Sequence, residues 1–393
     1  MIVECYIYLN YHNSMKKILF RKLLSDYLSF FFITIICTSI VIWVFQAVNY
    51  LDIMIEDGRD YLVYLNFTLL NFPKILSKVF SFSLFFSLFY VTIKSELNNE
   101  LIIYWNFGVH KIEVVNFILK VSFILMIIQI ILTAFVVPKS QDLARSFLKS
   151  SSINFFDNFI KPKKFNDTIK GVTIYSDKKD QNGDLINLYL KREIKPNEFQ
   201  ITYAKKGNFK QIGNSPILVL NEGATITIKN DDVTNISFSK SDFSLADIDT
   251  NTTTYKKTQE ISSQNLIICI KNFYQLEKKM FEKKVKDIEN CSYENIQNII
   301  KEFYKRFLIP FYIPLLTLVP LLLITTSKEN LNYNKLRVAT FSLGLIIIIF
   351  SETTISFISK ISIYDIGIMV IPLILISILY LFFFRQFNTS INN

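Results

Sequence analysis

Three charged residues within long apolar stretches are the side chains of this sequence best placed to do chemistry. Lys74 and Lys78 are four residues apart and therefore share one face of a helix, near one end of its apolar stretch. Glu352 lies in the outer third of another stretch. Ionisable groups inside membrane spans are rare and usually functional, and ammonium groups suit phosphates as point charges. Two alternatives remain: the lysines can extend to lipid headgroups, and Glu352 can pair with one of them.

These charges are positioned by six apolar segments, in two groups of three. Each has about 19 to 24 residues, which as a helix rising about 1.5 Å per residue crosses a hydrocarbon core of roughly 30 Å. The sequence therefore predicts a membrane protein with an N-terminal half, 1–138, and a C-terminal half, 306–393. The predicted spans are 27–48, 75–93, 114–137, 307–326, 338–358 and 363–384.

Composition agrees with this class of protein. The chain is 51% hydrophobic and has 37 Phe and 20 Tyr against 9 Gly, which favours lipid-facing side chains over a platform that stacks bases. A net charge of +10 would suggest nucleic acid in a soluble protein, but membrane topology and a hydrophilic domain account for it here. His12 and His110 do not make a metal site, and we expect no cofactor. Cys269 and Cys291 can pair if their segment is extracytoplasmic, and two free thiols fit equally well.

Positive charge is distributed unequally between the loops on the two sides of the membrane. One set of short loops holds ten Lys and Arg residues, whereas the opposite set holds only Arg59 and Lys360. Because Lys and Arg in short loops favour the cytoplasm, both termini are predicted to be cytoplasmic and the segment between the two halves extracytoplasmic. Met15 is typical of a translation start, so residues 1–14 are left open as an upstream extension. The ten residues are Lys16, Lys17, Arg21, Lys22, Lys94, Lys111, Lys328, Lys335, Arg337 and Arg385.

Prolines predict where the apolar segments are interrupted. Pro73 breaks the apolar run 62–93, so we expect 62–72 to be an interfacial segment that leads into the second span. Pro310, Pro314 and Pro320 predict a kinked fourth span, whose freed carbonyls neighbouring helices would satisfy.

The segment 139–305 is predicted to be an inserted all-β domain of jelly-roll type with a helical connector at its end. Short alternating runs such as 171–175 and 185–190 are separated by turn residues, a spacing typical of a sandwich or jelly roll. Residues 256–305 change to a helical period. An exposed sheet edge could accept a strand from another protein. The further strands expected are 200–204, 217–220, 224–228 and 236–238, with a turn at Glu222-Gly223.

A short amphipathic segment, about 97–108, lies between the second and third spans and is predicted to be a cytoplasmic coupling helix. Leu101, Ile102, Trp105 and Phe107 could anchor it in the groove of a partner. Glu100 near its start is favoured by the helix dipole and could meet a partner arginine. The alternative is a solvated loop helix. The sequence contains no Gly-x-x-x-x-Gly-Lys-(Ser/Thr) motif, so any nucleotide-binding subunit would be a separate protein.

The whole arrangement resembles the lipopolysaccharide-export permeases of the LptF/LptG family. That family's cytoplasmic helix begins Ser-Glu-(Leu/Met), with Gly after six further residues. Glu100, Leu101 and Gly108 match it, whereas Asn99 stands in place of Ser and Trp105 in place of Arg or His.

Two other regions support the resemblance. Glu302, Arg306 and Pro310 are similar to the Glu-x-His-x-Arg…Pro signature of the LptF branch, with Tyr304 in place of His. The order of strands and turns from 160 to 238 also follows the family.

The resemblance implies an inner-membrane permease subunit that extracts lipopolysaccharide from the outer leaflet and passes it to a periplasmic β-jelly-roll bridge. The implied partners are a paralogous permease, a cytoplasmic ABC ATPase dimer and a periplasmic jelly-roll transfer protein, with no nucleic acid. The chain itself would perform no covalent chemistry. Lys74, Lys78 and Glu352 would then lie near the phosphates of lipid A. The alternatives are a membrane-anchored periplasmic scaffold and a mechanotransmitting ABC permease for another envelope substrate.

Overall fold

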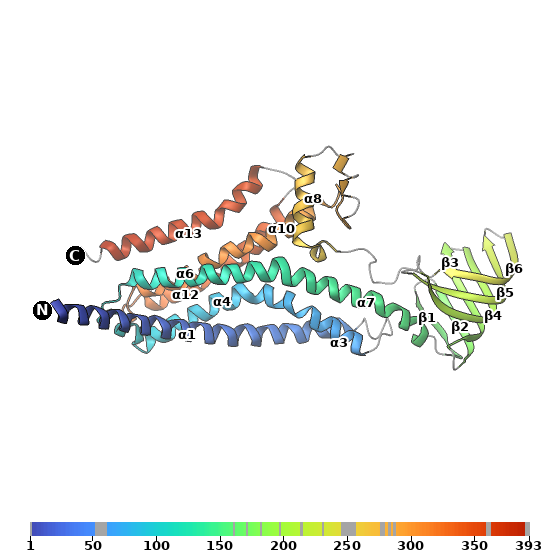
Figure 1. The fold of residues 1–393 in the computed structure, drawn as a ribbon, viewed down its shortest axis with the longest axis horizontal. Helices are drawn as coiled ribbons and strands as arrows, with labels where there is room; N and C mark the ends of the chain where they lie inside the picture. The colour runs from blue at the N-terminus through green and yellow to red at the C-terminus, as the bar shows by residue number, and fades with distance from the viewer. Residues whose placement is uncertain are drawn as a thin grey trace. The chain divides into compact units, whose positions relative to one another are not determined.

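The computed structural model (Figure 1) forms two compact units. The first unit comprises Met1–Val44, Asn71–Asp142 and Lys257–Asn393, and the second comprises Phe45–Leu70 and Leu143–Lys256. The structure describes residues 2–51, 61–159, 162–169, 172–180, 183–195, 198–212, 215–229, 232–244, 257–275, 280–281, 284–285, 288–358 and 363–389.

Six helices in the described part of the chain are long and apolar enough to cross a membrane, which confirms the six predicted spans. Several extend beyond the apolar segments because polar turns at their ends continue the helix. Their bounds are Met15–Asn49, Tyr61–Leu97, Lys111–Leu148, Ile296–Thr325, Tyr333–Phe357 and Val370–Asn388.

The spans and their connections are built from these helices. The N-terminal half contains α1 (Ile2–Asn49), α3 (Tyr61–Leu70), α4 (Phe72–Leu97), α5 (Glu100–Asn106), α6 (Lys111–Ile131), the π-helical turn η1 (Leu132–Val136) and α7 (Val137–Phe159). The C-terminal part contains η2 (Thr258–Glu260), α8 (Ser263–Gln275), α10 (Ile296–Phe307), η3 (Ile309–Phe311), α11 (Tyr312–Leu321), η4 (Leu322–Thr325), α12 (Tyr333–Phe357) and α13 (Ile363–Thr389).

Proline interrupts the helices where the sequence predicts it. The run 62–93 divides between α3 and α4, and Pro73 occupies the first turn of α4. The fourth span changes from α10 to the 3₁₀ turn η3, which contains Pro310, and then to α11. Every side chain of α11 is buried, and this helix packs against α4, α6, α12 and α13. The irregular fourth span is therefore the centre of the helical unit.

The second unit contains the predicted β domain as one open antiparallel sheet. The described strands lie in sequence order from β1 to β6, so they form a meander and not the Greek-key order of a jelly roll. One face packs a core that includes Leu188, Leu190 and Leu218. The strands are β1 (Phe165–Ile169), β2 (Val172–Lys179), β3 (Leu185–Lys195), β4 (Glu198–Ile212), β5 (Ser215–Lys229) and β6 (Asp232–Ser244).

The turn predicted at Glu222-Gly223 is wrong, because β5 continues through both residues. Glu222 has φ 51°, and Lys205 on β4 donates to its carboxylate at 2.8 Å. A Cβ at Gly223 would collide with the carbonyl oxygen of Tyr203. The Glu-Gly pair thus permits a local change of backbone conformation within a long strand, which the sequence pattern does not distinguish from a chain reversal.

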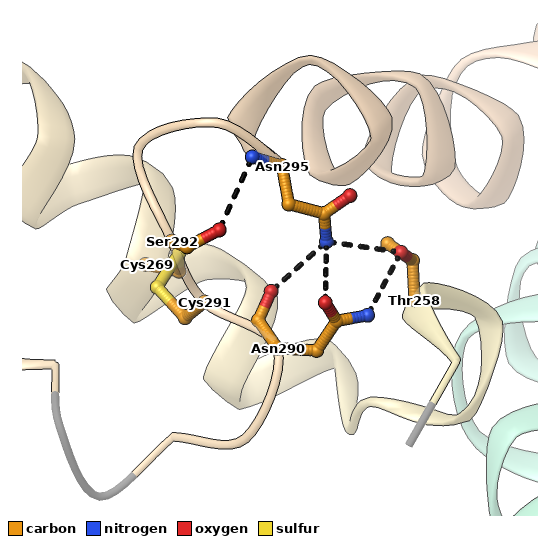
Figure 2. Close-up of a disulfide and its surroundings, with 6 residues drawn as sticks. All are labelled: Thr258, Cys269, Asn290, Cys291, Ser292 and Asn295. Carbon is orange, nitrogen blue, oxygen red and sulfur yellow. Dashed lines mark hydrogen bonds between the residues drawn. A yellow bond between two sulfur atoms is a disulfide. The ribbon is translucent and has the colours of Figure 1, made fainter. Parts of the chain in front are cut away.

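Residues from Lys257 onward belong to the helical unit, so the helical connector expected at the end of the segment 139–305 groups with the spans and not with the sheet. Cys269 on α8 and Cys291 form a disulfide that joins α8 to the segment before α10 (Figure 2). The pairing left open by the sequence is therefore present. Beside it, the Asn295 amide donates to the Asn290 carbonyl at 2.9 Å and to the Thr258 hydroxyl at 3.3 Å (Figure 2).

Candidate functional sites in the helical unit

The predicted coupling segment folds as the short helix α5. Asn99 before it has φ 60° and Gly108 after it has φ 70°, conformations that asparagine and glycine adopt more readily than other residues. The amide of Gly108 donates to the Trp105 carbonyl at 3.0 Å, and that of Val109 donates to the Tyr104 carbonyl at 3.0 Å. These bonds end α5 and direct the chain into α6.

The inner face of α5 is fixed to the helical core. Leu101 is 3% exposed, and it packs in the same cluster as Tyr104. The Tyr104 hydroxyl donates to the Leu19 carbonyl of α1 at 3.0 Å. Burial, with smaller effects of Asp26 and Glu100, raises the pKa of Tyr104 to about 12, so the phenol stays a neutral donor. Leu101, which was expected to be a partner anchor, instead holds α5 in place.

The outer face of α5 presents apolar side chains. Ile102 is 50% exposed, Ile103 is 47% exposed, and Phe107 is also exposed. Ile103 was not among the predicted anchors, although it follows Ile102 on the face opposite Leu101 and Tyr104. Trp105 is half-buried, with the Lys111 ammonium 5.7 Å from its ring centroid. The exposed apolar surface of α5 is therefore Ile102, Ile103 and Phe107.

Glu100 is half-buried at the start of α5. Its carboxylate accepts hydrogen bonds from the Ser95 hydroxyl at 3.2 Å and from the Asn98 side-chain amide at 3.3 Å. Glu100 thus closes the turn between α4 and α5. A carboxylate has about four acceptor positions, so these two bonds leave capacity for a partner arginine.

The two candidate lysines lie near one end of α4. The Lys74 ammonium is half-buried and donates to the Gln259 side-chain carbonyl at 2.9 Å, while Lys78 is exposed. Lys257, Lys305 and the Glu302 carboxylate are close enough to act electrostatically on Lys74. Sequence reasoning missed these two lysines, because neither lies within an apolar run near Lys74.

Glu352 is exposed on α12. Within the described part of the chain it forms no ion pair, so its predicted pairing with Lys74 or Lys78 is not observed. The described residues also contain no group of three His, Cys, Asp or Glu side chains placed to hold a metal ion.

Two of the signature residues, Glu302 and Arg306, form an ion pair on α10 that is here called the clasp. Arg306 is 2% exposed, and its Nε donates to Glu302 at 2.9 Å. Its two terminal nitrogens donate to the carbonyls of Gln259 at 2.9 Å and Ile261 at 2.8 Å, and to the Ser263 hydroxyl at 3.1 Å. Arg306 thereby holds the segment Lys257–Ser263, here called the strap, against α10.

The strap is also bound to the π-helical turn of the third span. The Ser263 hydroxyl donates to the Ala134 carbonyl within η1. Thr133, in the same turn, donates from its hydroxyl to the Arg306 carbonyl at 2.8 Å. A π-helical turn displaces carbonyls from the regular helical pattern, and here the Ala134 carbonyl accepts from the strap. This joint holds α10, η1 and the strap together.

The other signature positions are structural as well. Pro310 is buried in η3. Tyr304, at the position of the family's usual His, is buried, and its hydroxyl lies 3.2 Å from that of Thr354 on α12. Tyr304 thereby connects α10 to α12.

Six candidate spans in two groups of three, with an antiparallel sheet in the intervening chain, define a multi-pass membrane protein with an inserted β domain. Residues 21–386 match the family model described as lipopolysaccharide export system permease LptF/LptG. The chain belongs to this family, and the match includes both membrane halves and the sheet. The family model is shared by LptF and LptG.

A curated relative is the uncharacterized protein RP871 of Rickettsia prowazekii (strain Madrid E). It is 22% identical over 207 residues, which are 52% of this chain and 57% of that protein. The aligned region therefore spans a little more than half of each protein.

Proposed function

We propose that this chain is a permease subunit of an ABC-type exporter that extracts lipopolysaccharide from the outer leaflet of the inner membrane and passes it to a periplasmic β-jelly-roll bridge. The observation that carries the proposal is the family match across residues 21–386. The chain pairs with a paralogous permease, and a separate ATPase dimer hydrolyses ATP. The chain itself performs no covalent chemistry.

The surface of α5 supports the ATPase part of this proposal. Its inner face is fixed by Leu101 and Tyr104, whereas Ile102 and Ile103 point outward. An amphipathic helix held in this way can insert its apolar side chains into a partner groove. Glu100, beside that face, adds a charged contact.

Two observations support the orientation. Lys and Arg concentrate in the loops on the α5 side, as expected for cytoplasmic loops. The Cys269–Cys291 disulfide lies between η2 and α10, and disulfides persist in oxidising compartments such as the periplasm. The strap and α8 are therefore periplasmic, together with the inserted sheet.

The lysine group supports the lipid part. The Lys74 ammonium has three donors, of which Gln259 occupies one, and Lys78 lies one helical turn away. Lys257 and Lys305 add positive charge around Lys74, and the Glu302 carboxylate, which is paired with Arg306, offsets part of it. This is suitable chemistry for the phosphates of lipid A at the periplasmic end of the spans.

Replacing Lys74 and Lys78 together with Gln is expected to weaken lipopolysaccharide binding by an order of magnitude or more. The physical reason is that a charge-assisted contact is worth about 1.5–3 kcal/mol. Binding of lipid A with and without its phosphates to the purified complex measures the effect, and the loss should shrink for the dephosphorylated lipid. Lys120→Gln, which also removes an exposed charge from a span, serves as the matched control. Equal affinity of the unmodified complex for both lipids would show that the lysines are headgroup anchors.

The function is tested by purifying the chain from membranes with its bound proteins and lipid, and by reconstituting this complex in proteoliposomes. ATP-dependent release of lipopolysaccharide to a soluble acceptor is the expected result. A complex that contains no ATPase would favour a periplasmic scaffold. A complex with an ATPase that releases a different lipid would favour another envelope substrate.

A further inference from the structure

Lys111, the first residue of α6, connects three elements that are distant in sequence. Its ammonium donates to the Ile324 carbonyl in η4 at 2.9 Å. The same ammonium lies 5.7 Å from the ring centroid of Trp105 on α5 and 5.9 Å from that of Phe387 on α13. Both distances are within the range of a cation–π interaction. Lys111 therefore joins the coupling helix to the end of the fourth span and to the last helix.

A second connection lies beside it. The backbone amide of Lys328 donates to the Glu96 carboxylate at 3.1 Å, and the Lys328 ammonium donates to the Leu97 carbonyl at 3.2 Å. Glu96 and Leu97 are in the last turn of α4, immediately before α5. The turn after η4 is thus bonded to the helix end from which α5 begins.

These contacts are hydrogen bonds and cation–π interactions, which close packing of apolar side chains alone would not require. The last carbonyls of a helix lack intrahelical donors, and a lysine ammonium can satisfy them. Apolar packing of Trp105 and Phe387 alone would need no charge between them, and partial burial of an ammonium is unfavourable without partners. The Lys111 side chain meets this requirement with one carbonyl and two aromatic rings from both halves of the membrane unit.

These contacts also connect α5 to helices of both membrane halves. On its inner face α5 is bonded to α1 through Tyr104 and Leu19. Lys111 connects α5 to η4 and α13. The Lys328–Glu96 contact connects the end of α4, from which α5 begins, to the turn before α12. A displacement applied to the outer face of α5 would therefore act on both groups of three spans at their α5 end.

We propose that Lys111 is a positioning residue that transmits displacement of α5 to η4 and α13, with the Lys328–Glu96 contact as a second connection. This inference rests on the proposed role of α5 as the contact for an ATPase. It assigns to Lys111 a role in converting ATP hydrolysis into movement of the C-terminal half.

The structural test measures how firmly α5 is held relative to the turn after η4. Spin labels are placed at Asn106→Cys and Leu331→Cys, which are both exposed, and Asn106 lies outside the apolar surface of Ile102, Ile103 and Phe107. The background carries Cys5→Ser and Cys37→Ser, because these two cysteines do not belong to the Cys269–Cys291 disulfide. Pulsed electron–electron double resonance gives the distance distribution of the complex in nanodiscs. Lys111→Met should broaden this distribution. Lys111→Arg should restore it, since a guanidinium can also donate to a carbonyl and stack on aromatic rings.

The functional test measures lipid released per ATP hydrolysed by the reconstituted complex. Lys111→Met should lower this ratio by about tenfold, as expected for loss of a charge-assisted contact, while ATPase binding is retained. Glu96→Ala should lower it as well. Lys94→Met, an exposed lysine in the last turn of α4, should leave both readouts unchanged.

The outcomes separate this inference from the proposed function. An unchanged distance distribution in Lys111→Met, or a broadened one with an unchanged lipid-to-ATP ratio, overturns the inference. If the unmodified complex shows no ATP-dependent release, the proposed function fails. A broadened distribution that Lys111→Arg reverses would then still support the connection between α5 and the C-terminal half.

Discussion

Arg306→Met is expected to destabilise the helical unit by about 3–5 kcal/mol, the range for removing one partner of a buried charged pair. The substitution leaves Glu302 without its cation, and three acceptors in the strap lose their donor. Glu302 is 17% exposed, so water relieves part of the effect and the lower end of the range is favoured. Denaturant unfolding of the purified protein in detergent measures the change, and proteolysis near the strap should accelerate.

Two variants make this result specific to the clasp. Lys301→Met removes a neighbouring partly buried cation of α10 and should change stability by no more than about 0.5 kcal/mol. Glu302→Gln should cost less than Arg306→Met, because the amide oxygen can still accept from the Arg306 Nε. A stability of Arg306→Met equal to that of Lys301→Met would mean that the clasp does not hold the strap.

The spans could be predicted because apolar length is a local property of the sequence. A run such as 114–137 is long enough to cross a membrane whatever its neighbours are. Strands such as Leu185–Leu190 could be recognised for the same reason, since alternation is also local. The continuity of β5 through Glu222 and Gly223 could not, because turn residues also permit an unusual conformation within a strand.

The candidate sites divide in the same way. The spacing from Glu100 to Gly108 located α5, but a helix of seven residues has too little periodicity to show that Leu101 faces the core. Arg306 was recognised as part of a signature, but its role depends on the strap, about 45 residues earlier in the chain. In the sequence, Lys111 could be recognised only as one of the positively charged loop residues that predict the membrane orientation. Its contacts with Ile324 and Phe387 form only in the folded helical unit.

Replacing Ile102 and Ile103 together with Asp is expected to abolish stable association with the ATPase subunit. Both side chains are about half exposed, so the fold should tolerate the change. If they fill a groove on the partner, each half-exposed side chain loses about 0.8–1.5 kcal/mol of further apolar burial, and the two together correspond to a loss of about 10- to 100-fold in affinity. Each new carboxylate also has to be desolvated. Affinity purification followed by quantification of the ATPase subunit measures the result.

Leu331→Asp is the matched control for this prediction. Leu331 is 96% exposed in the turn before α12, which bonds through Lys328 to the end of α4 next to α5, and the same apolar-to-acidic change there should leave ATPase association intact. Ile102→Val with Ile103→Val should also retain it, because most of the apolar surface remains. ATPase association that survives the double Asp variant would show that α5 is not the contact surface. Loss in Leu331→Asp alone would move that surface to the turn between η4 and α12.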